Sequence, residues 1–321
     1  MKIFLTGATG FIGTAFLKKV LDQGWQVTAL VRDPKRLTVP AHPSLKLVTG
    51  DLVKPEPGGW GLQGHDAVVH LAGVLFARSQ AAFDSANVGG TASVLEATVA
   101  AGVPRFVFVS SCAASGPSRT FVAKTEEASP EPVSYYGQSK LRAETVVLGA
   151  RSKTHVTILR PPIVYGPGDQ DVAKLIKLVR AGFAIRFIGK SESRQKYYSA
   201  IFVEDLVRGL VMSVTHPAPS GEIFHLVGKD CISSNDFFAV VGEHLGVRPM
   251  RIPVPNWFLE TFAMWGAALS ERVNPNGRVS RDKIREMIPD FWVFSGEKAR
   301  KVMGFEPEMD YRSGMARTVV R

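Results

Sequence analysis

Cysteine and long apolar runs are scarce in this sequence. Its 321 residues include only two cysteines, Cys112 and Cys231, which excludes a disulfide framework and a cysteine-rich zinc module. No apolar run reaches the roughly 18 residues that a membrane-spanning helix needs. The first residues carry one positive charge and a short apolar run that ends at Gly7, unlike a secretory signal peptide. We therefore expect a soluble, cytoplasmic protein.

Acidic residues are in the minority, with 29 Asp and Glu against 39 Lys and Arg, and the formal charge is +10. Such an excess suits a nucleic acid, a membrane surface or a phosphorylated ligand. No helix-turn-helix, zinc-finger or aromatic RNA-binding motif appears, and the seven histidines show no metal-ligand spacing. We expect no nucleic-acid partner and no metal. With 45% hydrophobic and 21% charged residues, the chain can form a packed core.

The first half of the chain alternates short β-rich runs with longer helical patterns. The clearest helices are expected at 83–101 and 136–150. Strands are expected at 2–5, 27–31, 45–48, 67–71, 106–109 and 156–159, because each is a short apolar run bounded by Gly, Pro or charge. Repeated β-α units predict a largely parallel sheet with right-handed crossovers.

Beyond Gly168 the alternation of strand and helix patterns is less regular. Strands are expected at 199–203 and 223–227, whereas 180–196 and 228–321 look like helical or loop material. We therefore expect two interleaved domains. The first covers 1–168, continued by 198–228, and binds a dinucleotide. The second, smaller and mostly helical, covers 169–197 and 229–321 and binds the substrate.

A glycine-rich turn joins the first expected strand to a helix that runs to about residue 23. Gly7 permits a tight turn, Gly10 lets the backbone approach a pyrophosphate, and Gly13 allows the helix to pack closely on the sheet. Free N–H groups and the helix dipole make an anion site there. The turn predicts a dinucleotide-binding, Rossmann-type doubly wound α/β fold.

The residues after the second expected strand indicate which dinucleotide binds. An NAD site usually places an Asp or Glu there to hold the ribose 2′-hydroxyl. Here Arg32 follows the strand at 27–31 and precedes Asp33. A guanidinium suits the 2′-phosphate of NADP because it forms paired, charged hydrogen bonds. We expect NADP(H), with NAD(H) as the alternative if Asp33 takes the ribose.

A set of short motifs resembles those of the extended short-chain dehydrogenase/reductase family, an epimerase/dehydratase-like group. The resemblance covers about residues 1–230. Besides the glycine loop, the motifs are Gly50-Asp51-Leu52, His70-Leu71-Ala72-Gly73, Asn87-Val88-Gly89-Gly90-Thr91, Val109-Ser110-Ser111, Tyr136-Gly137-Gln138-Ser139-Lys140 and Leu159-Arg160-Pro161. Together with Arg32, the resemblance implies these cofactor-binding residues: Gly7, Thr9, Gly10, Phe11, Ile12, Gly13, Asp51, Leu52, Leu71, Ala72, Gly73, Tyr136, Lys140 and Pro161.

Tyr136 and Lys140 are the candidate catalytic pair. They are four residues apart, so they project from one face of a helix. An ammonium beside the phenol lowers the tyrosine pKa toward working pH, which suits proton exchange with a substrate hydroxyl or carbonyl. Tyr135 has no lysine four residues on. The resemblance favours Ser111 over Ser110 for holding the substrate oxygen, and Asn87 is expected to hold backbone near the site.

The second half departs from the family's sugar-nucleotide branch. There a strand resembling 198–205 begins with an arginine that holds the substrate pyrophosphate, whereas this chain has Tyr198. Arg194 and Lys196 lie nearby as possible substitutes. The chain looks more like the dihydroflavonol reductase and 3β-hydroxysteroid dehydrogenase branch, which acts on bulky, apolar alcohols and ketones.

The stretch 253–265 carries aromatic residues at helical spacing. We expect it to be mainly core, with a substrate-pocket wall and a membrane-contacting face as the alternatives. The leading interpretation is an NADP(H)-dependent oxidoreductase that interconverts a carbonyl and an alcohol on an apolar small molecule. A nucleotide-sugar epimerase or dehydratase and a non-catalytic NADP-binding sensor or assembly factor are the alternatives. By analogy with the family, the helices at 83–101 and 136–150 would form a homodimer interface.

Overall fold

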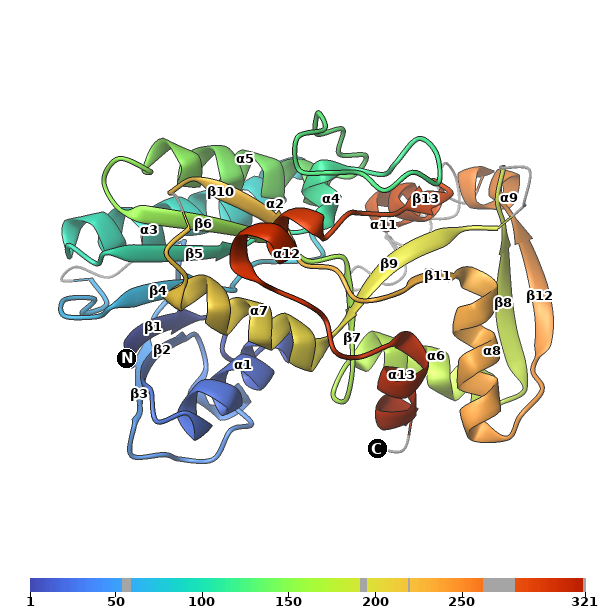
Figure 1. Ribbon diagram of the computed structural model, residues 1–321, viewed down its shortest axis with the longest axis horizontal. Helices are drawn as coiled ribbons and strands as arrows, with labels where there is room; N and C mark the ends of the chain where they lie inside the picture. Colours follow the sequence, from blue (N-terminus) through green and yellow to red (C-terminus); the bar gives the residue numbers. More distant parts are fainter. Residues whose placement is uncertain (54–58, 191–194, 219, 262–280, 320–321) are drawn as a thin grey trace.

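A seven-stranded, wholly parallel sheet forms the centre of the protein (Figure 1). The computed structural model describes residues 1–53, 59–190, 195–218, 220–261 and 281–319. The strand order is β10-β6-β5-β4-β1-β2-β3. The strands are β1 (Lys2–Thr6), β2 (Gln26–Val31), β3 (Leu45–Thr49), β4 (Ala67–His70), β5 (Arg105–Val109), β6 (His155–Arg160) and β10 (Glu222–His225).

Helices cover both faces of this sheet. On one face, α1 (Phe11–Asp22) and α7 (Val203–Thr215) pack on side chains such as Ile3 and Leu5. On the other, α3 (Gly90–Ala100) and α5 (Tyr135–Gly149) pack on side chains that include Phe4 and Phe108. Successive residues of β1 thus enter opposite cores, as a strand buried on both faces requires. The expected doubly wound α/β fold is confirmed.

Two smaller sheets lie beside the central one. The first has the order β11-β9-β13, with β7 also paired to β9, and the second pairs β8 with β12. Their strands are β7 (Ile163–Tyr165), β8 (Phe183–Ile188), β9 (Tyr197–Phe202), β11 (Cys231–Ser233), β12 (Met250–Pro255) and β13 (Phe291–Trp292). The remaining helices are α2 (Gln80–Phe83), α4 (Cys112–Ser115), α6 (Gln170–Arg180), α8 (Ser234–Leu245), α9 (Asn256–Thr261), α11 (Arg281–Met287), α12 (Glu297–Met303) and α13 (Tyr311–Val319).

Three local expectations are wrong. The segment 180–196 contains strand β8 rather than only helix or loop. The segment 228–321, also expected to be helix or loop, contains strands β11, β12 and β13. The helix expected at 83–101 is present, although it is π-helical at Asp84–Gly89 before it continues as α3. In the stretch 253–265, residues 253–255 belong to β12, and Trp257 is 65% exposed rather than in the core. Residues 262–265 lie outside the described part.

No helix in the described ranges is long and apolar enough to cross a membrane. The order of strands in the central sheet reverses between β1 and β4. The loops after these two strands therefore diverge at the carboxyl edge, where open α/β sheets bind their ligands.

Candidate active site

The glycine loop after β1 packs directly on the loop after β4. Gly7 has φ +79°, and a Cβ there would lie 2.7 Å from the Ala72 nitrogen. A Cβ on Gly13 would lie 2.0 Å from the Gly7 carbonyl oxygen. Gly10 precedes α1 with no side chain capping the helix, and the first turn carries no acid. This bare helix terminus fits a dinucleotide pyrophosphate.

The other expected cofactor residues surround this loop. Thr9, Phe11, Ile12, Leu71 and Ala72 are half-buried, and Gly73 is exposed. A Cβ on Gly73 would lie 3.9 Å from Lys140 Nζ, so the loop after β4 reaches the catalytic candidates.

Pro161, another expected cofactor residue, comes directly after β6. It is buried, and its carbonyl oxygen accepts a 2.9 Å hydrogen bond from the Cys112 N–H. This bond joins the segment after β6 to the start of α4, next to Ser111.

The remaining expected cofactor residues, Arg32, Asp51 and Leu52, follow the carboxyl ends of β2 and β3. The Asp33 carboxylate accepts a hydrogen bond from the Lys35 N–H at 3.0 Å and so caps its own short turn. Arg32 is exposed, and within the described ranges no side chain pairs with it. Asp51 accepts the Val53 N–H at 2.9 Å, and Leu52 packs into the core.

Ser110 and Ser111, at the end of β5, face different partners. Ser110 is buried and donates a short hydrogen bond to Glu144. Ser111 accepts the Ala113 N–H at 3.1 Å, and its hydroxyl is near enough to the Tyr136 phenol to lower that group's pKa. Of the two serines, Ser111 is thus the one that the structure brings to the tyrosine.

Tyr136 lies in the first turn of α5. Burial raises the pKa of its phenol well above the ordinary value, the Glu286 carboxylate raises it further, and the nearby Ser111 hydroxyl acts in the opposite direction. The competing phenol of Tyr135 packs instead against the guanidinium of Arg285, 5.0 Å from the ring centre.

Lys140 is buried under the carboxyl end of β5. Its Nζ donates to the Val109 carbonyl at 2.7 Å and lies 4.2 Å from the centre of the Phe108 ring. Burial lowers the Lys140 pKa to about 7, while the Glu144 carboxylate acts to raise it. The ammonium is therefore poised to exchange its proton near neutral pH.

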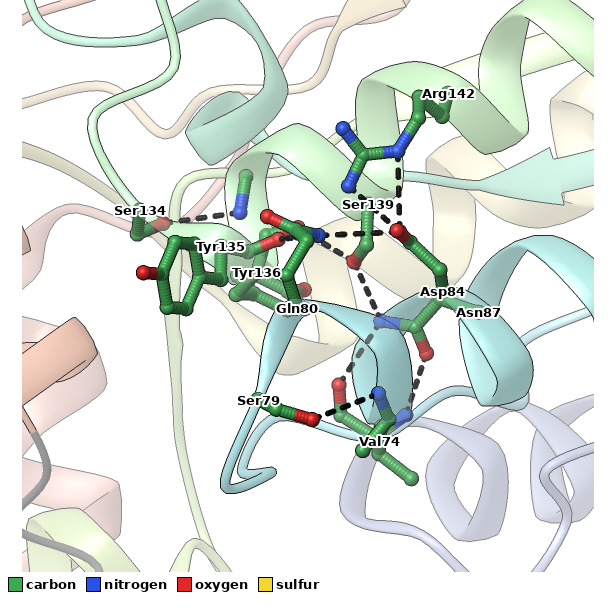
Figure 2. Close-up of polar contacts among 12 residues, drawn as sticks. Val74, Ser79, Gln80, Asp84, Asn87, Ser134, Tyr135, Tyr136, Ser139 and Arg142 are labelled. Carbon is green, nitrogen blue, oxygen red and sulfur yellow. Dashed lines mark hydrogen bonds and ion pairs between the residues drawn. The ribbon is translucent and has the colours of Figure 1, made fainter.

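Asn87 holds the backbone beside the site (Figure 2). Its amide oxygen accepts from the Val74 N–H at 2.8 Å, and its nitrogen donates to the Val74 carbonyl and to Ser139 Oγ. These bonds link the loop after β4 to α5. They give Asn87 the backbone-holding position that we expected. The π-helix that carries Asn87 had no signal in the sequence.

His70 lies beneath the cofactor loop between two threonines. Its Nδ1 is 2.7 Å from Thr6 Oγ1, and its Nε2 is 3.0 Å from Thr91 Oγ1. Thr91 donates its own proton to the Asn87 carbonyl at 2.6 Å, so it must accept from His70 Nε2–H. Burial, together with the nearby Lys140 charge, lowers the His70 pKa to about 3.

Sequence reasoning gave no role to four charged residues around the site, although Arg160 stands in the Leu159-Arg160-Pro161 motif. Glu144 and Arg160 form a buried ion pair with contacts of 2.6 and 2.8 Å. Asp282 and Glu286, from α11, contact the start of α5. Glu144 was detectable as the residue four positions after Lys140, but nothing near Tyr136 in the chain signals α11.

The proposed substitutes for the missing arginine behave differently. Arg194 lies outside the described part. Lys196 is fully buried, and its Nζ donates to the Met287 and Ile288 carbonyls at 2.8 and 2.6 Å. It is therefore not free to hold a substrate pyrophosphate, and that expectation is wrong for Lys196.

Comparison with known proteins identifies the family. The model of the NAD dependent epimerase/dehydratase family matches residues 3–226. The chain belongs to this family. It is an extended short-chain dehydrogenase/reductase enzyme, an oxidoreductase or epimerase that depends on a nicotinamide dinucleotide.

Two curated relatives and one solved structure illustrate its range. The chain is 28% identical to a ceramide reductase of Caulobacter vibrioides over 296 residues, covering 91% of this chain and 85% of the relative. It is 27% identical to a 3 beta-hydroxysteroid dehydrogenase/Delta 5-->4-isomerase of Mycobacterium tuberculosis over 328 residues, covering 95% and 86%. The structure of MoeE5 in complex with UDP-glucuronic acid and NAD matches with a TM-score of 0.78 at 24% identity, covering 100% and 98%.

Proposed function

We propose that this protein is an NADP(H)-dependent oxidoreductase that interconverts a carbonyl and an alcohol on a largely apolar small molecule. The observation that carries the proposal is the placement of Tyr136 and the buried Lys140 on one face of α5, with the Ser111 hydroxyl near enough to lower the pKa of the Tyr136 phenol and Ser110 withdrawn into a bond with Glu144.

In this proposal the chain's own residues divide the proton chemistry. Ser111 holds the substrate oxygen, and Tyr136 gives that oxygen a proton during reduction or removes one during oxidation. The structure does not show the lowered tyrosine pKa that the sequence predicted, because burial raises it and Lys140 Nζ is bonded to the Val109 carbonyl. In the proposal, Lys140 favours the phenolate only when its ammonium turns toward the phenol. When bound along the glycine loop, the dinucleotide supplies or accepts the hydride.

The preference for NADP rests on the exit of β2. The Asp33 carboxylate already caps the turn through the Lys35 N–H, whereas the exposed Arg32 has a guanidinium free for a 2′-phosphate. In parallel titrations we expect tighter binding of NADP than of NAD, and a loss of that preference in Arg32→Ala. Tighter binding of NAD by the unmodified protein would overturn the assignment.

An apolar substrate is supported by the loop between Ser111 and Tyr136. This loop exposes Phe121 by 54%, and the Phe121 ring packs edge-on against Tyr197 at 4.7 Å and lies 6.3 Å from Phe291. Exposed aromatic rings suit contact with an apolar ligand. Two named relatives, the ceramide reductase and the steroid dehydrogenase, point to the same substrate class.

The direct test follows NADPH absorbance with steroid, long-chain and flavonoid ketones and with UDP-sugars. Tyr136→Phe should keep NADP binding and lower kcat by about 100-fold or more, whereas the matched Tyr135→Phe should retain turnover. Near-full activity of Tyr136→Phe would refute the catalytic role. If the protein retained bound NAD and converted UDP-sugars without net cofactor oxidation, an epimerase would be favoured. If no substrate panel gave turnover, a non-catalytic dinucleotide-binding protein would be favoured. Cytoplasmic placement and a homodimer through α3 and α5 stay predictions.

A further inference from the structure

Helix α11 holds the first turn of the helix that carries Tyr136. The Asp282 carboxylate accepts hydrogen bonds from two successive backbone N–H groups, those of Tyr135 and Tyr136, the second at 3.1 Å. One turn along α11, the Glu286 carboxylate accepts a 2.7 Å hydrogen bond from Ser134 Oγ. Residues 134–136 are thus bonded to a helix that is almost 150 positions away in the chain.

These bonds cap the start of α5, which residues close in the sequence usually do. The first N–H groups of a helix have no partner inside it, and a nearby side chain normally accepts from them. Ser134 does this for the Gly137 N–H at 2.9 Å, but the N–H groups of Tyr135 and Tyr136 depend on Asp282. Asp282 is only 7% exposed, so water does not readily replace it.

The position of α11 is itself fixed by its packing against α9 and the β8–β12 sheet. Ile284, between the two acids, is 2% exposed and packs in a small apolar cluster with Leu259 of α9, Phe187 of β8 and Val254 of β12. The backbone of Tyr136 is therefore tied, through α11, to the packing of the β8–β12 sheet.

We propose that Asp282 and Glu286 are positioning residues for the reaction at Tyr136, Asp282 by fixing the tyrosine backbone and Glu286 by fixing Ser134, which in turn holds the Glu286 carboxylate at the start of α5. The proposal rests on the acid–base role given to Tyr136 above, and extends it to a helix outside the family motifs.

The charged and titratable groups that face the phenol can be named. Glu286 comes from α11, where Lys283 pairs with it at 2.8 Å. Cys112 comes from α4, and Lys140, on Tyr136's own helix, directs its Nζ to the Val109 carbonyl. Besides these, the uncharged Ser111 hydroxyl lowers the pKa of the phenol, and the Phe83 ring lies 6.1 Å from the Tyr136 ring. Glu286 is the only carboxylate among the charged groups that raise the phenol's pKa.

The first test is Asp282→Asn, which keeps the shape of the side chain but offers one acceptor oxygen and a donor in place of two acceptors. Amide hydrogen exchange at Tyr135 and Tyr136 should accelerate about tenfold or more, and kcat should fall about tenfold with little change in the KM for the cofactor. Asp310→Asn is the matched control, because Asp310 also accepts a backbone N–H at a helix start, from Ser313 at 2.8 Å in α13. It should change neither quantity.

The second test is Glu286→Gln, which keeps an acceptor for Ser134 but removes the charge. The pH profile of kcat/KM should move to lower pH by about 0.5–1 unit, because the phenol then ionises more easily. An unmoved profile, or faster exchange in Asp282→Asn with unchanged kcat, would overturn the positioning role. Unchanged exchange would overturn the backbone contact itself. The exchange measurement needs no turnover, so it separates this inference from a failure of the proposed function.

Discussion

Glu144 and Arg160 form a two-point ion pair in which both side chains are 2% exposed. The pair joins α5 to the carboxyl end of β6, and Glu144 also accepts from Ser110 at the end of β5. Three elements that carry site residues are therefore locked together at one carboxylate.

Breaking this pair should strongly destabilise the fold. Glu144→Gln leaves the Arg160 charge buried without its counter-ion, and we expect a loss of about 3–5 kcal/mol in the free energy of unfolding. Chemical denaturation measures it. Arg119→Gln is the control, since Arg119 pairs with Glu131 on the surface at 84% side-chain exposure, and the denaturation midpoint should stay in place. A loss below about 1 kcal/mol in Glu144→Gln would place the pair in the range of surface pairs.

The elements that the sequence predicted well are those with a local physical cause. Most strands of the central sheet are buried on both faces, so they read as short apolar runs, although the edge strand β3 is largely exposed. Strand β8 is also a short apolar run, FAIRFI, but it lies outside the central sheet. It exposes Phe183, and it pairs with β12, which contains two prolines that disfavour a strand.

The site shows the same division. The glycine loop and the Tyr136–Lys140 pair have fixed local spacings and could be found in the chain. The contact of Asp282 with the start of α5 depends on tertiary packing over almost 150 residues. The separate duties of Ser110 and Ser111 depend on the orientation of β5, and the family resemblance alone distinguished them in the sequence.

His70 should stay neutral in the Nε2–H form well below pH 6. With its pKa lowered to about 3, the folded protein takes up no proton there, while the unfolded chain does so from about pH 6.5. The free energy of unfolding should therefore fall as pH drops from about 6.5 toward 3. Nitrogen-15 NMR of the imidazole, assigned with His70→Gln, reads the tautomer directly. A His70 resonance that titrates above pH 5, or a protonated Nδ1, would contradict the arrangement with Thr6 and Thr91.

Lys140 should make the cofactor-free protein more stable at alkaline pH. Below about pH 7 the ammonium is charged in both the folded and unfolded states, so the folded state bears the full free-energy cost of burying the charge. Between about 7 and the ordinary value of 10.5 only the unfolded chain keeps the proton, so stability rises with pH, by an amount on the order of a few kcal/mol.

Lys140→Met removes this rise and flattens the pH dependence of the denaturation midpoint over the same window. Lys174→Met, on the exposed side of α6, is the control and should keep the shape of the unmodified curve. A Lys140→Met protein that still gains stability between pH 7 and 10 would show that another group causes the rise.

Two glycine-to-alanine substitutions distinguish the effect of close packing in the glycine loop from the effect of helix propensity. In Gly13→Ala the new Cβ would lie 2.0 Å from the Gly7 carbonyl, a backbone atom that cannot move without displacing the loop on Ala72. We expect a loss of about 1–3 kcal/mol in stability and a loss of NADP binding by titration. Gly149→Ala, at the end of α5, meets nothing within 4 Å and should gain up to about 1 kcal/mol with binding unchanged. If both variants bound NADP as the unmodified protein does, the glycine loop would not hold the dinucleotide, and Arg32 would lose its place in the cofactor site.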